Sequence, residues 1–323
     1  MQIFDKGKIY DFMSYRYHSL VISFLLIIAS IFFMATKGFN YGIDFSGGTL
    51  IQVRYDSPAP ISKIREKFDT IESLKGASVT EFGSKEEITI RYSGSSSSIG
   101  EDPAAAMSEL LKDTGNFEIR RVDIVGPKVG DELRKSGIMA LSISLILILI
   151  YLAFRFEWKF ALAAIVGEFH DVIITLGVIS FFEIDVNLDI LAAVLTIVGY
   201  SLNDTIIVFD RIREGIKESK STDIFYIINE SVSKTLSRTI LTSFTTFISV
   251  FVLYLFGGDM IHGFSFVVLV GVIAGTLSSV FVAAQALMWF KFSVIDYRNF
   301  LEQKLKKKKE KERMRALYEK GTI

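Results

Sequence analysis

The chain has 323 residues, of which 50% are hydrophobic and 13% aromatic, and its mean hydropathy is +0.40. The 36 lysine and arginine residues balance 36 aspartate and glutamate residues, so the excess positive charge typical of nucleic-acid-binding proteins is missing. The absence of cysteine excludes disulfide scaffolds, thiol chemistry and iron–sulfur clusters, and three histidines leave little for a metal site. The composition therefore indicates a membrane protein, and we expect no cofactor, no metal and no nucleic-acid partner.

Six long apolar runs divide the sequence, and each is long enough to cross a ~30 Å hydrocarbon core as a helix. Backbone amides in lipid have to be paired internally, which leaves helices as the form that we expect for these runs. No small-residue cleavage site follows the first run, so we interpret it as a retained helix and not as a signal peptide. The sequence predicts an α-helical polytopic membrane protein with six transmembrane helices at 19–36, 138–154, 160–182, 188–209, 240–256 and 264–290.

Segment 37–137 holds all four prolines and reads as a water-soluble domain between helices one and two. Alternating apolar and polar residues indicate half-buried strands, and Pro103 suits the first turn of a helix. The order β-α-β-β-α-β predicts an α+β ferredoxin-like domain. The domain contains no histidine, so it offers no catalytic triad and we do not expect an enzyme. The expected strands are 49–55, 79–82, 88–92 and 118–125, the helices are 61–74 and 103–113, and 93–101 is a Ser/Gly-rich loop.

The basic residues of the short loops predict the orientation. Loop 210–239 carries six lysines and arginines and tail 291–323 carries 11, whereas loops 183–187 and 257–263 carry none. This alternation places the N-terminal segment 1–18 and the basic tail in the cytosol, and segment 37–137 outside it.

The apolar residues Ile224, Ile228, Val232 and Leu236 recur every four residues. This spacing predicts an amphipathic helix that lies on the cytosolic membrane surface. Segment 296–320 reads as a charged helix or a disordered arm. We expect it to fix the topology and to touch anionic lipid, with docking to a partner as the alternative.

Charged residues inside membrane runs are costly, so each is a functional hypothesis. Asp204, beside Asn203 in the fourth run, and Arg238, at the start of the fifth, are the candidates for proton coupling. An acid whose burial opposes ionisation, and whose neighbouring arginine favours it, can exchange a proton when the geometry changes. The alternative is a static ion pair that joins two helices.

His170 and Asp171 are secondary polar candidates in the third run. As neighbours on a helix they point about 100° apart and cannot both face one partner, so a structural role is the alternative. Glu168 could share a face with Asp171 and be a hydrogen-bond partner. In the sixth run, four small residues at a spacing of four indicate a helix-packing face: Gly271, Gly275, Ser279 and Ala283.

Four motifs, in order along the chain, resemble the SecD/SecF family of protein-export membrane proteins, within the resistance-nodulation-division superfamily. They are the segments 42–49, 125–133, 199–214 and 235–243. Segment 37–137 is short compared with the outer domain of SecD, which favours the SecF branch. The matching positions include Gly42, Asp44, Gly47, Gly48, Gly126, Pro127, Gly130, Asp210 and Arg211, which we interpret as structural.

The resemblance implies a subunit of the bacterial inner membrane that pairs with SecD and assists the SecYEG channel. Such proteins use the proton-motive force to draw unfolded preprotein out on the periplasmic side, and YajC- or YidC-like membrane proteins are further partners. It implicates Asp204 and Arg238 in proton transport, matches His170 and Asp171 to the family's third helix, and leaves Glu168 outside its pattern. Asp210 and Arg211 would close the fourth helix.

Two other functions stay open on the sequence. A small-molecule efflux half-transporter of the same superfamily would have a larger outer domain and, in general, a second six-helix half. A purely structural subunit would tolerate Asp204→Asn. Phosphate-loop and dinucleotide-binding enzymes are excluded, because the nucleotide motifs are absent and the glycines at 42–48 precede a strand.

Overall fold

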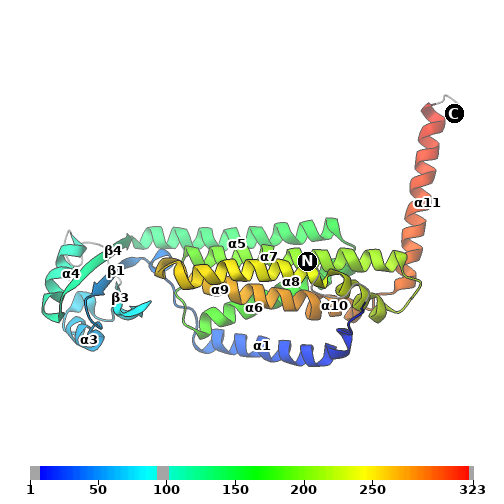
Figure 1. Cartoon of the computed structure of the whole chain (residues 1–323). Helices are drawn as coiled ribbons and strands as arrows, with labels where there is room; N and C mark the ends of the chain where they lie inside the picture. Colours follow the sequence, from blue (N-terminus) through cyan, green and yellow to red (C-terminus); the bar gives the residue numbers. More distant parts are fainter. Residues whose placement is uncertain (1–7, 93–101, 320–323) are drawn as a thin grey trace.

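The computed structural model describes residues 8–92 and 102–319, so the predicted loop 93–101 lies outside the described residues. The molecule is elongated, with a small α+β domain at one end of a bundle of long helices and a single helix projecting at the other (Figure 1). We call these the domain end and the tail end.

The α+β domain confirms the ferredoxin-like order. Its four antiparallel strands are arranged β2-β3-β1-β4. The alternate residues Ile51 and Val53 of β1 are fully buried against the two helices, as their spacing predicts. Asp102 caps α4, since its Oδ1 accepts hydrogen bonds from the amides of Ala104 and Ala105. The elements are β1 (Gly48–Tyr55), α3 (Ile61–Asp69), β2 (Ser78–Phe82), β3 (Ser84–Tyr92), α4 (Pro103–Leu111) and β4 (Phe117–Val125).

Six helices in the described residues are long and apolar enough to span a membrane. The last of them contains a π-helical segment, Ser279–Ala283, between α9 and α10. The helices are α1 (Arg16–Thr36), α5 (Pro127–Arg155), α6 (Trp158–Phe181), α7 (Leu188–Glu218), α8 (Ile224–Phe256), α9 (Asp259–Ser278) and α10 (Ala284–Trp289), and the tail is α11 (Val294–Glu319).

Three helices, α5, α7 and α8, extend well beyond the apolar runs predicted for them. α5 begins at Pro127 rather than at 138, and it includes polar turns before the apolar run. The proline suits this position, because its fixed backbone angle fits the first turn of a helix. α7 continues through Asp210 and Arg211 to Glu218. The expectation that this pair closes the fourth helix is therefore wrong.

The expectation of a separate helix on the membrane surface at 210–239 is also wrong. The segment forms the end of α7, a short connection and the first turns of α8. Ile228 and Val232 of α8 are buried in one cluster with Ile212 and Ile216 of α7. The apolar stripe thus packs against a neighbouring helix, and protein covers it.

The tail is a helix over its described length. Of the two predictions for segment 296–320, the charged helix is therefore the one that the structure shows. Arg298 anchors its start by donating hydrogen bonds to the carbonyls of Ile216, Ser219 and Ser221 at the end of α7. From this anchor α11 runs across the direction of the bundle helices (Figure 1).

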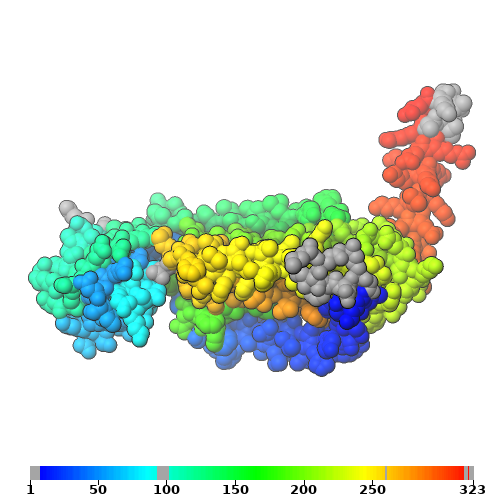
Figure 2. Space-filling view, viewed as in Figure 1, coloured from blue at the N-terminus to red at the C-terminus, as the bar shows by residue number. Residues whose placement is uncertain are grey.

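α6, α7 and the α9–α10 helix form the centre of the bundle, whereas α1, α5 and α8 are mostly exposed. The space-filling view shows α5, α8 and α1 along one face (Figure 2). Glycines let α9 approach α7 closely: a β-carbon on Gly271 would lie 2.3 Å from Ile197, and one on Gly275 would lie 2.9 Å from Ser201. This contact confirms the predicted packing face.

Candidate functional site: acids inside the bundle

Asp204 lies inside the bundle on α7 and is 1% exposed. Its Oδ2 accepts a hydrogen bond of 3.2 Å from the Ser243 hydroxyl of α8. The Thr276 hydroxyl of α9 lies 2.8 Å from the same serine oxygen. A carboxyl group and two hydroxyls therefore connect three helices, and each hydroxyl can both accept and donate a proton.

Asp171 of α6 is fully buried and forms the centre of a second polar cluster. Its Oδ2 accepts hydrogen bonds from the hydroxyls of Ser201 on α7 and Ser278 on α9, the latter at 2.6 Å. Its Oδ1 lies 2.9 Å from His170 Nδ1. Because Ser201 precedes Asp204 by one helical turn, the two clusters lie one above the other along α7.

His170 and Asp171 contact each other but face different surroundings. Asp171 points toward α7 and α9, whereas His170 lines an apolar groove of about 520 Å³ with residues of α1 and α9. Its Nε2 is buried and has no partner among the described residues. The expectation that the two cannot share one partner agrees with this arrangement.

Arg238 does not pair with Asp204 in the described part of the chain. It is exposed and lines a polar groove of about 390 Å³ nearer the tail end, between α7 and α8. The static ion pair is therefore absent. The groove is also lined by Ile207, Asp210, Arg211, Glu214, Lys234 and Thr235.

Charged side chains at the tail end hold the helix ends together. Asp210 forms ion pairs with Arg155 of α5 and, at 3.5 Å, with Arg213. Arg211 pairs with Glu214 on the same helix. Asp210 and Arg211 thus act inside α7, and Asp210 ties this helix to α5.

The two other polar candidates of the membrane runs lie apart from both clusters. Asn203 is exposed on α7, next to Asp204 in sequence but on another face. Glu168 is 6% exposed and lies between α6 and α5, where it makes no hydrogen bond with Asp171. The expectation that Glu168 partners Asp171 is therefore wrong, because its carboxyl group points to a different helix.

The glycine motif forms the joint between the α+β domain and the bundle. Gly42 donates a 2.8 Å hydrogen bond to the Val186 carbonyl just before α7, and Asp44 accepts one of 3.1 Å from the Leu188 amide. Gly47, with φ +69, leads through Gly48 into β1. Segment 42–48 therefore fixes the start of α7 beside the first strand.

The second part of this joint is the start of α5. Gly126 precedes the helix as its N-cap, and Pro127 is its first residue. The first turn lies against Gly47, since a β-carbon on Gly130 would be 2.7 Å from the Gly47 nitrogen. Both motifs therefore meet at Gly47 and Gly130, where a β-carbon on either residue would clash with backbone atoms.

Sequence reasoning did not bring the surrounding hydroxyls together with the two acids. Ser201, Ser243, Thr276 and Ser278 come from three helices, and no periodicity within one helix brings them together. The available signal was the presence of serines and threonines in apolar runs. Among the described residues, no group of three histidine, aspartate or glutamate side chains could hold a metal ion.

Comparisons with known proteins agree with this architecture. The model for "Protein export membrane protein SecD/SecF, C-terminal" matches residues 106–293, and the model for "SecD/SecF GG Motif" matches residues 32–59. The second match covers the glycine side of the joint.

Two curated relatives are named "Protein translocase subunit SecF". The protein of Helicobacter pylori (strain ATCC 700392 / 26695) is 44% identical over 323 residues, covering 100% of both chains. That of Vibrio alginolyticus is 46% identical over 285 residues, covering 88% of this chain and 90% of its own.

Among solved structures, the crystal structure of SecDF from Thermus thermophilus, described as a translocon-associated membrane protein, superposes with a TM-score of 0.81 at 32% identity. The match covers 88% of this chain and 39% of that chain, so the chain spans well under half of the SecDF polypeptide. A SecDF structure in a super-membrane-facing form gives a TM-score of 0.64 at 31% identity. The chain therefore belongs to the SecF protein translocase subunits, multi-pass membrane proteins of the SecD/SecF family.

Proposed function

We propose that this subunit works with SecD at the SecYEG channel and uses the proton-motive force to promote the late stage of preprotein translocation. The subunit is a transport protein and not an enzyme. In this proposal Asp204 is the group that gains and loses the coupling proton, and Arg238 governs its access from the tail end.

The observation that carries the proposal is the environment of Asp204. It is an almost fully buried acid on a central helix, linked through Ser243 and Thr276 to two others. No ion pair holds its charge among the described residues. A change in its protonation would therefore alter hydrogen bonds between α7, α8 and α9 and shift how these helices pack.

Arg238 supports the second half of the proposal. It lies in a polar groove that opens near the tail end of α7 and α8, on the same two helices as Asp204 and Ser243. A small sliding of α8 along α7 would bring the arginine nearer to the acid and favour release of the proton. Moving one charge across 100 mV supplies about 2.3 kcal/mol, enough for such a step.

The orientation follows from the basic residues. The short connections at the domain end, 182–187 and 257–258, contain no lysine or arginine, whereas Arg155, Lys159 and Lys220 lie at the tail end. The tail end and both termini would therefore face the cytosol, and the α+β domain would face the periplasm of a bacterial inner membrane.

The family match supports SecD as a proposed partner. The match covers 39% of the SecDF chain, and in this proposal SecD supplies the remainder. The exposed polar residue Asn203 on α7 would lie at this subunit contact. The α+β domain would meet unfolded preprotein, while anionic lipid and YajC- or YidC-like proteins would contact the membrane part.

The test is gradient-dependent export in inverted membrane vesicles that contain the complex with SecD. Asp204→Asn is expected to abolish the acceleration of late-stage export on energisation while leaving assembly with SecD intact. Asp189→Asn is the matched control, since it makes the same change on the exposed first turn of α7. If the Asp204→Asn complex still responds to the gradient, Asp204 is not the coupling group and a structural role replaces the proposal.

A further inference from the structure

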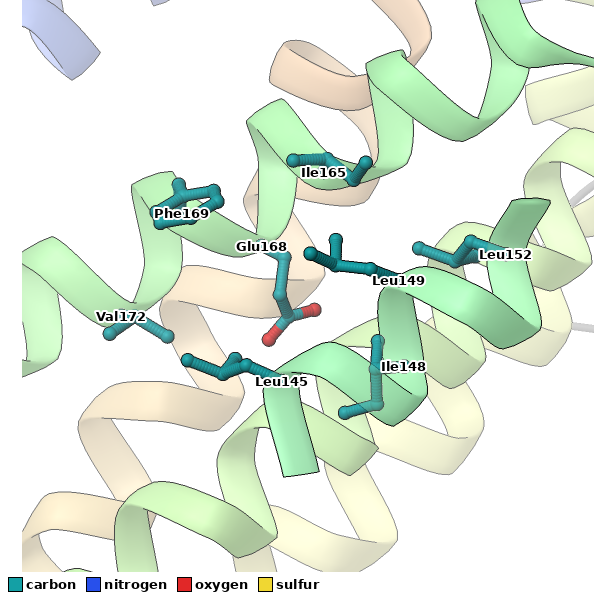
Figure 3. A pocket seen from close by; sticks show the side chains of 8 residues that line it. All are labelled: Leu145, Ile148, Leu149, Leu152, Ile165, Glu168, Phe169 and Val172. Atoms are coloured by element: carbon teal, nitrogen blue, oxygen red, sulfur yellow. The ribbon is translucent and has the colours of Figure 1, made fainter. Parts of the chain in front are cut away.

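A third acid inside the bundle, Glu168, belongs to neither polar cluster. Its carboxyl group projects from α6 into a cavity of about 40 Å³ against α5 (Figure 3). All the other residues around the cavity are apolar. They are Leu145, Ile148, Leu149 and Leu152 of α5 and Ile165, Phe169 and Val172 of α6.

This carboxyl group has no hydrogen-bond partner for one of its oxygens. Oε1 is buried and unpaired in the described part of the chain. The cavity has room for a water molecule, but a buried water needs two to four polar partners and the walls supply only the carboxyl group itself. The oxygen therefore faces hydrocarbon.

Among the described residues, no positively charged side chain lines the cavity around Glu168. α5 carries no charged residue between 138 and 154, and its last residue, Arg155, pairs with Asp210. The titratable neighbours on α6 are His170, which lines the groove toward α1, and Asp171, which faces α7 and α9. An ionised carboxylate without a partner or water is strongly disfavoured, so the neutral acid is the stable form here.

We infer that Glu168 is a membrane-buried proton-binding site, occupied in this conformation, that exchanges its proton when α5 separates from α6. The carboxyl group binds a proton while hydrocarbon surrounds it, and it can release that proton once water or a cation reaches it. The inference goes beyond the role proposed for Asp204 and does not require it, because the two acids lie on different helices in separate surroundings.

The fold contains a means of opening this cavity. α5 is one continuous helix from Pro127, at the glycine joint with the α+β domain, to Arg155, and it forms one wall of the cavity on the way. Most of its surface is exposed, so few contacts inside the described chain hold it against α6. A movement of the domain would therefore be transmitted along α5 to Glu168.

The experiment is covalent labelling with dicyclohexylcarbodiimide, a hydrophobic reagent that adds to protonated carboxyl groups in apolar surroundings. The complex of the full chain with SecD is treated in membranes, and the adduct is located by mass spectrometry. We expect a stable N-acylurea on Glu168, formed more slowly as the pH rises. Glu168→Gln should lose it, and Asp204→Asn should keep it.

Two results would overturn the inference. In one, Glu168 is modified only by a water-soluble carbodiimide with a charged amine, which means that water and not hydrocarbon surrounds the carboxyl group. In the other, neither reagent modifies Glu168 in the assembled complex, which means that no exchange occurs there. Neither result bears on Asp204, whose test is export under a gradient.

A second measurement tests whether α5 separates from α6. The chain has no cysteine, so Leu149→Cys and Ile165→Cys, on opposite walls of the cavity, can be joined by a short thiol cross-linker in a complex with cysteine-free SecD. Cross-linking is expected to suppress labelling of Glu168, and reduced uncross-linked protein serves as the control. Labelling at an unchanged rate would contradict the separation of α5 from α6.

Discussion

Gly130 in the first turn of α5 meets Gly47 backbone to backbone. A β-carbon on Gly130 would lie 2.7 Å from the Gly47 nitrogen, and one on Gly47 would lie 2.8 Å from the α-carbon of Pro127. Gly47 also has φ +69, a conformation that suits glycine. These contacts join the second membrane helix directly to the segment that enters β1, so the α+β domain and α5 are mechanically continuous.

Gly130→Ala is expected to destabilise this joint by about 1–3 kcal/mol, because backbone atoms cannot move aside as a flexible side chain can. The measurement is the apparent melting temperature of the purified complex. Gly126→Ala is the matched control, since a β-carbon there meets no atom within 4 Å. Equal melting temperatures for the two variants would show that the joint can relax.

The contact between α7 and α9 permits a test by second-site compensation. Gly271→Ala places a β-carbon 2.3 Å from Ile197 and is expected to cost about 1–3 kcal/mol. Ile197→Ala removes the clashing atoms, so the double variant should be more stable than the sum of the two single effects predicts. The readout is a double-mutant cycle on thermal stability, with Gly199→Ala as the unhindered control. Simple additivity would contradict the contact.

Much of the fold could be predicted from the sequence, because hydropathy and alternation are local signals. The six helices and the ferredoxin-like sheet order are examples. The position of α8 was only partly local: Asp223 caps its first turn by accepting a hydrogen bond from the Phe225 amide. Ile228, however, is buried in one cluster with Ile212 of α7, and no window along the chain contains that packing. An apolar stripe is the same pattern whether lipid or another helix covers it.

The candidate site could also be predicted only in part. Asp171 and Asp204 stood out because a charge in an apolar run is rare. Their hydroxyl partners did not, because serine and threonine in helices commonly bond to their own backbone, as Thr242 does to the Arg238 carbonyl. The proximity of Asp204 to Arg238 was inferred from order along the chain, whereas in the structure Arg238 lies in the groove toward the tail end.

Ser243→Ala tests the hydrogen bonds that link Asp204 of α7 to α8 and α9. It removes the donor to Asp204 and the acceptor for Thr276, and the loss of a buried hydrogen bond costs about 1–3 kcal/mol. We expect gradient-stimulated export to fall while export without a gradient is retained. Ser249→Ala on the same helix is the control, because its hydroxyl bonds to the Thr245 carbonyl of its own helix. An unchanged response to the gradient would exclude this connection from the coupling.

The buried hydroxyl of Tyr297, at the tail end, predicts how the stability of the protein depends on alkaline pH. Burial raises the pKa of its hydroxyl from 10.0, although Arg213, which donates to that oxygen at 3.3 Å, opposes the shift. The hydroxyl itself donates to Glu157 at 3.0 Å. Because the folded pKa exceeds the unfolded value, the protonated form stabilises the fold fully below pH 10.0, and this stabilisation is lost as the pH rises through the folded pKa.

Tyr297→Phe should therefore be less stable than the parent at neutral pH and lose less stability in strong alkali, so the two curves converge as pH rises. The measurement is the apparent melting temperature across the alkaline range. Tyr226→Phe, at an exposed position of α8, is the control, and the buried Tyr55 and Tyr92 remain in every variant, so their titration cancels in the difference. Parallel curves for Tyr297→Phe and the parent would mean that this hydroxyl does not titrate with unfolding.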